Sequence, residues 1–189
     1  MNLVEPIRTR EKIDAMKAYL REKNLRDYTL FCLGINSGLR VSDLLALQVA
    51  DISSLQDGRR LVKERLALRD KKTGKVKEYP LSPQVRQVLN EYLSSTHPQG
   101  WLFPSRLGSR PIDRTQAWRI ISEAARAVGV SGRIGTHTLR KTFGYWAFKH
   151  GYDITLIQKL LNQSSPGITL AYIGITKAEL DEVCLALNL

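Results

Sequence analysis

The sequence predicts a mainly α-helical protein that carries a small antiparallel β-sheet, an α+β fold in a single domain over residues 1–189. Three observations lead to this prediction. Apolar residues recur at helical spacing over most of the chain. Between residues 51 and 81 the pattern changes to strand-like alternation. A chain of 189 residues, 43% of them hydrophobic, is long enough for one core and too short for two comfortable domains.

Three helices are expected to lead the chain. Residues 9–23 repeat apolar side chains at every third or fourth position, and Thr9 can cap the start. A more apolar helix follows over residues 25–38, and its end is marked by Gly38. Ser42 then begins a short third helix.

The sheet is expected between residues 51 and 81. Two alternating runs flank the sequence D-K-K-T-G, in which Thr-Gly is typical of a hairpin turn. A first short strand near Ile52 would complete a three-stranded antiparallel sheet. Ser82, followed by proline, then begins another helix.

The second half of the chain is expected to be helical after a loop rich in turn residues. Asp113 can cap one helix and Thr136 the next. Asp153 can begin a third helix, and Thr176 with Glu179 forms a capping box before the last one.

Basic residues are concentrated in two segments. Lys plus Arg is 29 against 18 for Asp plus Glu, a formal charge of +11. Residues 58–77 and 105–150 each hold nine basic side chains, and the combined net positive charge of these two segments exceeds that of the whole chain. Residues 151–189 are slightly acidic. This distribution predicts a basic surface that faces a polyanion.

Several classes of protein are not supported by the sequence. No apolar run approaches the roughly 18 residues of a membrane span, and the N-terminus lacks the apolar region of a secretion signal. Cys32 and Cys184 both fall in apolar patterns, which predicts buried thiols in a reducing cytoplasm rather than a disulfide. No spacing of metal ligands is present.

The sequence T-H-T-L-R at residues 136–140 is the first candidate for chemistry. His137 and Arg140 lie three residues apart, so a helix would place a proton-handling group beside a fixed cation on one face. By itself this pair is more often structural than catalytic.

A second segment gives the pair its context. The sequence GINSGLRVSDLLALQVAD, from Gly34 to Asp51, resembles the first conserved box of the tyrosine recombinases, also called the phage integrase family. The resemblance makes Arg40 the first phosphate-binding arginine. It makes Asp43 the acidic residue that braces Arg40.

The remaining boxes of that family follow in order. Lys72 stands where the sheet-borne lysine precedes Thr-Gly, His137 and Arg140 form H-x-x-R, and Thr-Leu-Ala-Tyr ends on Tyr172. The resemblance spans about residues 10–175. It therefore implies the fold of a tyrosine recombinase catalytic domain.

One position departs from the family pattern. Members usually read L-G-H-S-S shortly before the nucleophile, but this chain has Gln163 in place of the second histidine or its tryptophan substitute. A glutamine amide can donate a hydrogen bond to a phosphate oxygen, but it cannot carry charge or a proton. A weaker or differently tuned site is one consequence of the substitution.

The resemblance implies a role for each matched residue. Arg40 and Arg140 would bind the phosphate, and Tyr172, after the turn-rich sequence S-S-P-G, would attack it. Lys72 would donate a proton to the departing 5′ oxygen, and His137 would accept the nucleophile's proton or bind the phosphate. No metal or nucleotide cofactor is implied.

Further lysines are expected to contact DNA. Lys71 and Lys75 compete with Lys72 for the role of general acid. The expected DNA-binding side chains are Lys71, Lys75, Lys77 and Lys141.

The leading functional hypothesis is a site-specific DNA recombinase that forms a 3′-phosphotyrosyl intermediate on double-stranded DNA. The alternatives are a recombinase-derived DNA-binding protein with reduced chemistry and a type IB topoisomerase. The resemblance also implies a tetramer on DNA, in which the last helix docks onto a neighbour, although that helix could instead pack on its own domain.

The chain leaves no room for the N-terminal core-binding domain of most relatives, because the first box begins near residue 34. We expect either a natural catalytic-domain-only recombinase, as in the fimbrial-phase inversion group, or a shortened chain.

Overall fold

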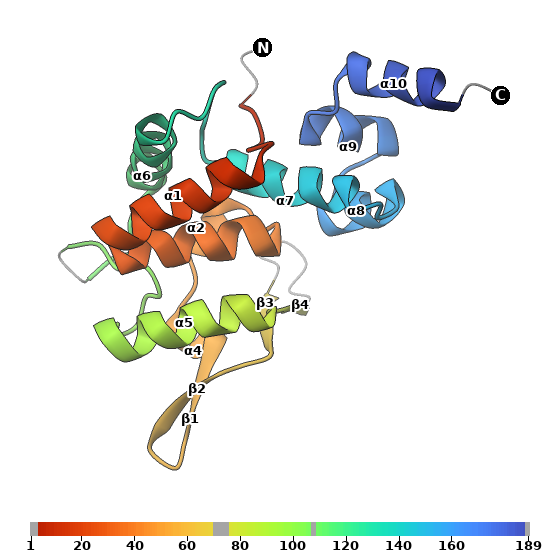
Figure 1. Ribbon diagram of the computed structural model, residues 1–189. Helices are drawn as coiled ribbons and strands as arrows, with labels where there is room; N and C mark the ends of the chain where they lie inside the picture. The colour runs from red at the N-terminus through yellow and green to blue at the C-terminus, as the bar shows by residue number, and fades with distance from the viewer. Residues whose placement is uncertain (1–3, 70–75, 107–108, 188–189) are drawn as a thin grey trace.

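The computed structural model describes residues 4–69, 76–106 and 109–187. Within these ranges the chain folds mainly into helices, with two short hairpins (Figure 1). The elements are α1 (Arg10–Lys23), α2 (Leu25–Ser37), α3 (Val41–Leu45), α4 (Val49–Ile52), β1 (Ser53–Gln56), β2 (Arg59–Val62), β3 (Arg65–Arg69), β4 (Val76–Pro80), α5 (Pro83–Thr96), α6 (Arg114–Ala127), α7 (Thr138–Lys149), α8 (Ile154–Leu160), α9 (Pro166–Ile173) and α10 (Lys177–Leu187). The predicted α+β class is confirmed.

Helix α2 is the centre of the core. Residues 28–34 are all buried, and α1, α5 and α7 pack around them. Two glycines let α2 approach α7: a Cβ on Gly34 would lie 2.6 Å from Leu139, and one on Gly38 would lie 2.6 Å from Phe143. The end of α2 is thereby held against α7.

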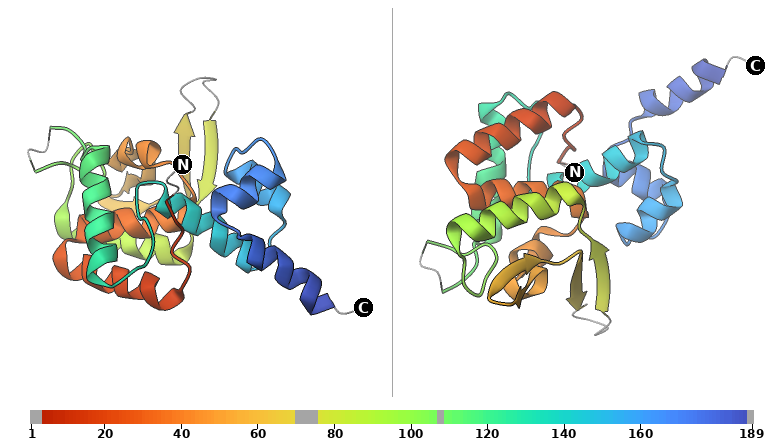
Figure 2. Two further views of the ribbon diagram at one scale, coloured as in Figure 1. Left: turned by 90° about the horizontal axis from the view of Figure 1, so that it is seen from above. Right: turned by 60° about the horizontal axis from the view of Figure 1, so that its bottom comes forward.

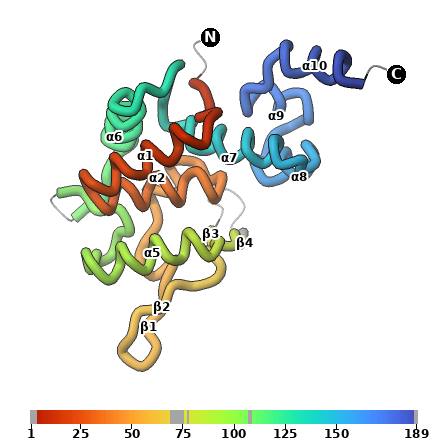
Figure 3. The backbone as a smooth tube through the Cα atoms, viewed as in Figure 1, coloured from red at the N-terminus to blue at the C-terminus, as the bar shows by residue number. Residues whose placement is uncertain are grey.

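The prediction of one three-stranded sheet is wrong. Among the described strands, β1 pairs with β2 and β3 with β4, in two separate antiparallel sheets. Asp57 and Gly58 both have positive φ, 49° and 73°, which is the geometry of a tight two-residue hairpin turn between β1 and β2. The expected first strand near Ile52 is present as β1, which begins one residue later, whereas Ile52 itself is the buried last residue of α4. The β1–β2 hairpin projects beyond α5 (Figure 3).

Most predicted helix starts form as expected. The side chains of Ser82, Asp113 and Asp153 each accept a hydrogen bond from a backbone N–H in the first turn of their helices. The Thr176 hydroxyl accepts from the Glu179 N–H at 3.2 Å, and the Glu179 carboxylate accepts from the Thr176 N–H at 3.0 Å. These residues complete the predicted capping box.

Two helix starts differ from the prediction. Thr9 precedes α1, but its side chain makes no capping hydrogen bond. Helix α7 begins at Thr138, two residues after Thr136. The reason is that the buried Thr138 hydroxyl accepts the Gly135 N–H at 3.0 Å and closes a turn before the helix.

The segment before α1 forms hydrogen bonds with α7 and with the end of α9. The Ile7 N–H donates to Thr142 Oγ1 at 2.9 Å, and the Trp146 indole N–H donates to the Ile7 carbonyl at 2.9 Å. Arg8 donates to the Gly174 carbonyl at the end of α9 at 2.6 Å. The N-terminal segment therefore crosses α7 and reaches the helix that carries Tyr172.

The C-terminal helices form a smaller cluster around Ile157, Leu161 and Ile173. Helix α10 projects away from them and buries none of its residues (Figure 2). The prediction that both cysteines are buried is therefore right for Cys32 and wrong for Cys184, which lies on α10. None of the helices in the described ranges has the length and apolar character to cross a membrane.

Candidate functional site

Arg40 occupies the turn between α2 and α3. Helix α2 ends at Gly38 with a φ of 64°, and Arg40 then has extended backbone as the N-cap of α3. Its side chain is exposed. The charge of Arg40 influences the pKa values of His137, Arg140 and Tyr172, so the four groups lie close together.

Arg140 is buried on α7, with 6% of its surface exposed. Its guanidinium donates to the Gly38 carbonyl from one nitrogen and to the Leu161 carbonyl from another. Arg140 therefore joins three segments: the turn that carries Arg40, helix α7 and the end of α8. Burial lowers the pKa of Arg140, and Tyr172 opposes this effect.

His137 and Tyr172 face each other across the site. The Tyr172 hydroxyl lies 3.5 Å from Nδ1 of His137, which is the N-cap residue of α7. In the tautomer with its proton on Nε2, this nitrogen can accept the phenolic proton. The phenol and the imidazole thus lie at the limit of hydrogen-bonding distance.

Helix α9 holds Tyr172 over α7. Residues 164–167, expected as a turn-rich lead-in, form the cap and first turn of α9, where the Ser165 hydroxyl accepts a backbone N–H. A Cβ on Gly144 of α7 would lie 2.6 Å from Ile173, so only glycine permits this close packing. The packing fixes Tyr172, the neighbour of Ile173, beside the N-terminus of α7.

The electrostatics determine the resting protonation states of His137 and Tyr172. Burial lowers the pKa of His137, and the surrounding cations, Arg114 first among them, lower it further. Burial raises the pKa of Tyr172, while Arg140 and Arg40 oppose this rise. At neutral pH a neutral imidazole therefore faces a protonated phenol.

Asp43 is half-buried on α3, but it forms no ion pair with Arg40 in the described structure. Burial lowers the pKa of Arg140, and the Asp43 carboxylate opposes this lowering. The expected role of Asp43 as a brace for Arg40 stays a prediction. Among the described residues, no three His, Cys, Asp or Glu side chains gather as metal ligands would.

Gln163 is half-buried in the turn after α8, two residues beyond the Leu161 carbonyl that Arg140 holds. Its N–H donates to the Gln158 carbonyl, and the Gln158 amide donates to the Gln163 carbonyl at 3.2 Å. Its own side-chain amide makes no hydrogen bond to a described residue, so it is available to a ligand.

The predicted lysines have different outcomes. Lys71, Lys72 and Lys75 lie outside the described residues. Lys77 pairs with Leu68 across β3 and β4, and only its backbone is described. Lys141 is 3% exposed, which does not fit the prediction that it contacts DNA directly.

Sequence reasoning missed Arg114, the exposed first residue of α6. Its charge is the largest cationic influence on the pKa of His137. The signal was weak, because a basic residue after the capping Asp113 is common on any exposed helix. Only the packing of α6 beside the start of α7 reveals its position.

Comparison with known proteins identifies the family of the chain. The family model described as "Phage integrase family" matches residues 8–179. The chain is 46% identical over 175 residues to the probable integrase/recombinase YoeC of Bacillus subtilis strain 168, covering 93% of this chain and 92% of that protein.

Solved structures share the fold. A XerA recombinase superposes with a TM-score of 0.75 at 22% identity, over 98% of this chain and 66% of that one. A post-cleavage complex of the XerH site-specific recombinase with a palindromic difH substrate gives 0.72 at 18% identity, over 97% of this chain and 53% of that one. From the family match and the identity to YoeC, the chain belongs to the phage integrase family of tyrosine recombinases.

Proposed function

We propose that the protein is a site-specific DNA recombinase that cleaves and rejoins double-stranded DNA through a 3′-phosphotyrosyl link to Tyr172, without metal or ATP. The observation that supports this best is the 3.5 Å approach of the Tyr172 hydroxyl to His137 beside two arginines. A nucleophile, a base and two fixed cations are the groups that displacement at a phosphodiester requires. The two free cysteines support a reducing, cytoplasmic setting for this activity.

Each group has one task in the reaction. Arg40 and Arg140 bind the nonbridging oxygens, and the Gln163 amide adds a hydrogen bond. The phenolic oxygen of Tyr172 bonds to phosphorus as the bond from phosphorus to the 5′ oxygen breaks. The phenolic proton passes to His137, and Lys72 donates a proton to the 5′ oxygen. Rejoining reverses these steps with a new 5′ hydroxyl.

Binding of duplex DNA rests on charge. The XerH structure was solved with its difH substrate, and the present chain has the same fold. The positive segments 58–77 and 105–150 include β2, β3, α6 and α7. We infer that these elements contact the phosphate backbone around the site.

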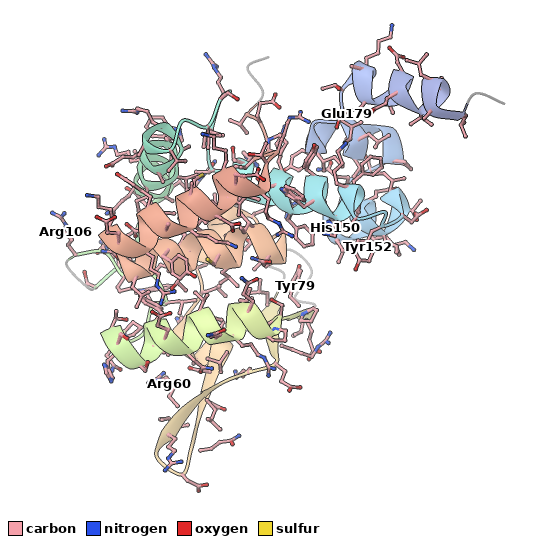
Figure 4. The ribbon with its side chains drawn as sticks, viewed as in Figure 1. Arg60, Tyr79, Arg106, His150, Tyr152 and Glu179 are labelled. Carbon is pink, nitrogen blue, oxygen red and sulfur yellow. The ribbon has the colours of Figure 1, made fainter. Side chains whose placement is uncertain are left out.

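We also infer that the protein acts as a tetramer whose copies exchange α10. This helix leaves several large apolar side chains exposed: Leu180, Val183, Leu185 and Leu187. A groove of about 710 Å³ between α1, α7 and α8 has a mainly apolar lining. Tyr152 and His150 lie at its edge, where α7 ends (Figure 4). The apolar side chains of α10 from a second copy would match the mainly apolar lining of that groove.

The test uses a pool of nicked random-sequence duplexes, in which the cleaved end diffuses away and traps the intermediate. Wild-type protein should form a covalent protein–DNA band, and sequencing its DNA should reveal a preferred site. Tyr172→Phe should abolish the band, whereas Tyr19→Phe, a half-buried tyrosine on α1, should retain it. Absence of the band would favour a DNA-binding protein without chemistry. Plasmid relaxation with no site preference would favour a topoisomerase.

A further inference from the structure

The buried position of Lys141 is unusual for a lysine. It follows Arg140 on α7 and is 3% exposed, so DNA cannot reach most of its side chain. Lysine is almost never buried without a partner, because removing the ammonium from water is costly. Burial lowers the pKa of this amine. A charge kept in such a place needs a compensating group.

The partner is the nucleophile. Lys141 Nζ lies over the ring of Tyr172, 5.2 Å from its centroid. Within the described residues the ammonium makes no hydrogen bond or ion pair, although Glu5 and Arg8 of the N-terminal segment act on it with opposite signs. The Glu5 carboxylate is engaged by Arg8 at 3.1 Å. The aromatic ring is therefore the direct contact of the Lys141 charge.

This contact differs from the others that Tyr172 makes. His137 approaches the hydroxyl, and Arg140 and Arg40 act on its oxygen from the phosphate-binding side. Lys141 lies over the ring instead, where substrate need not displace it. A cation at a ring attracts a phenolate more strongly than a neutral phenol, because the ionised ring carries the negative charge.

We propose that Lys141 is a positioning residue for the nucleophile, holding the Tyr172 ring with its hydroxyl toward His137 and stabilising the phenolate that attacks phosphorus. The inference rests on the proposed function, since it assigns Lys141 to the same strand-cleavage step. The proton still passes from Tyr172 to His137, and Lys141 exchanges none. Its effect is electrostatic and acts through Tyr172.

The test compares Lys141→Met, which keeps the length and removes the charge, with Lys141→Arg, which keeps the charge. Lys23→Met is the matched control, because Lys23 Nζ lies 5.8 Å from the ring centroid of Tyr19, far along the chain from the site. Two readouts are needed: the rate of covalent complex formation against pH, and the titration of Tyr172 followed by ¹³Cζ-tyrosine NMR, assigned with Tyr172→Phe.

Lys141→Met should raise the pKa of Tyr172 by about 0.5–1 unit and slow cleavage at neutral pH by about 3- to 10-fold. Its pH–rate curve should be displaced to higher pH by the same amount, with DNA affinity unchanged. Lys141→Arg should recover at least half of the displacement, and Lys23→Met should match wild type. His137, Arg140, Arg40, Arg114, Glu5 and Arg8 remain in every variant. Because the Lys141 charge also lowers the pKa of His137, the titration of Tyr172, rather than the pH–rate curve alone, decides whether Lys141 acts on the phenol.

Two results would overturn the inference. An unchanged Tyr172 titration in Lys141→Met would show that the ammonium does not act on the phenol. Weaker DNA binding, with a salt dependence shallower by about one unit and an unchanged rate for bound DNA, would make Lys141 a phosphate contact. The NMR titration needs no catalysis, so a wild-type protein that forms no covalent band would refute the proposed function separately.

Discussion

Arg140 shows how one residue can serve both fold and site. Its guanidinium donates to the carbonyls of Gly38 and Leu161, which close the turns before Arg40 and Gln163. A planar group with five N–H donors can do this and still present a hydrogen to a phosphate, whereas a lysine ammonium cannot span both carbonyls. Arg140 thus holds the two turns that carry Arg40 and Gln163, and it is also proposed to bind the phosphate.

The lowered pKa of His137 predicts a pH dependence of stability and of rate. The unfolded chain, whose histidine has the ordinary pKa near 6.5, binds the proton more tightly than the folded one. The contribution of His137 to the free energy of unfolding should therefore be at its maximum above pH 6.5. It should decrease as the pH falls through the lower pKa that His137 has in the folded protein. Cleavage should fall over the same range, because a protonated imidazole cannot accept the phenolic proton.

Urea denaturation at pH 7 and pH 5 checks this prediction. The loss of unfolding free energy between the two values should be smaller in His137→Asn than in wild type. His97 and His150 are present in both proteins, so their contributions cancel. An equal loss in both variants would show that His137 titrates normally.

At the scale of elements, the packing of helices determines the position of Tyr172. Helix α9 lies on α7 at Gly144, and the same helix face carries Arg140 one turn earlier. A residue with a Cβ at Gly144 would force α9 outward by displacing Ile173 and Leu161. The distance between Tyr172 and His137 therefore depends on one glycine.

Gly144→Ala should slow cleavage by at least about 10-fold and destabilise the protein by about 1–3 kcal/mol, because overpacking displaces α9. DNA affinity should stay near wild type, since the substitution is internal. Gly167→Ala is the matched control: it lies in the first turn of α9, where a new Cβ meets nothing within 4 Å. Urea denaturation and covalent-complex rates measure both variants, and equal behaviour of the two would contradict the role of Gly144.

The elements themselves were largely readable from the sequence. Capping residues such as Asp113 and Asp153 fixed helix starts because their side chains compete locally for backbone N–H groups. Strand pairing was not readable to the same degree: Ile52 has the apolar character of a strand residue but packs in α4. The Asp57-Gly58 turn was available in the sequence as a hairpin signal and indicates two hairpins rather than one sheet.

At the scale of the whole molecule, α10 is a helix that buries none of its described residues. Arg8 and Lys149 bind Glu179, labelled in Figure 4, at the first turn of α10, at 3.4 and 3.0 Å, so the start of this helix is anchored. Its large apolar side chains are exposed. An anchored helix with an uncovered apolar surface suits docking onto another copy.

Val183→Asp should weaken assembly on DNA by about 10- to 100-fold per interface, since burial of an apolar side chain of this size contributes about 1.5–3 kcal/mol. Val183 is 57% exposed, so the fold of each copy should be kept. Ala18→Asp on the exposed surface of α1 controls for the added charge. Sedimentation of protein–DNA complexes measures the number of copies, and an unchanged number in Val183→Asp would exclude α10 from the interface.

The sequence by itself determined the fold class and the family, and it predicted Arg40, His137, Arg140 and Tyr172 as site residues, because they occur in ordered motifs of fixed spacing. The tertiary structure alone decided the influence of Arg114 on His137 and the burial of Lys141 against the ring of Tyr172. Spacing along one helix or turn is a local property that the sequence contains. Burial and charge between α3, α6, α7 and α9 arise only when segments distant in the chain pack together.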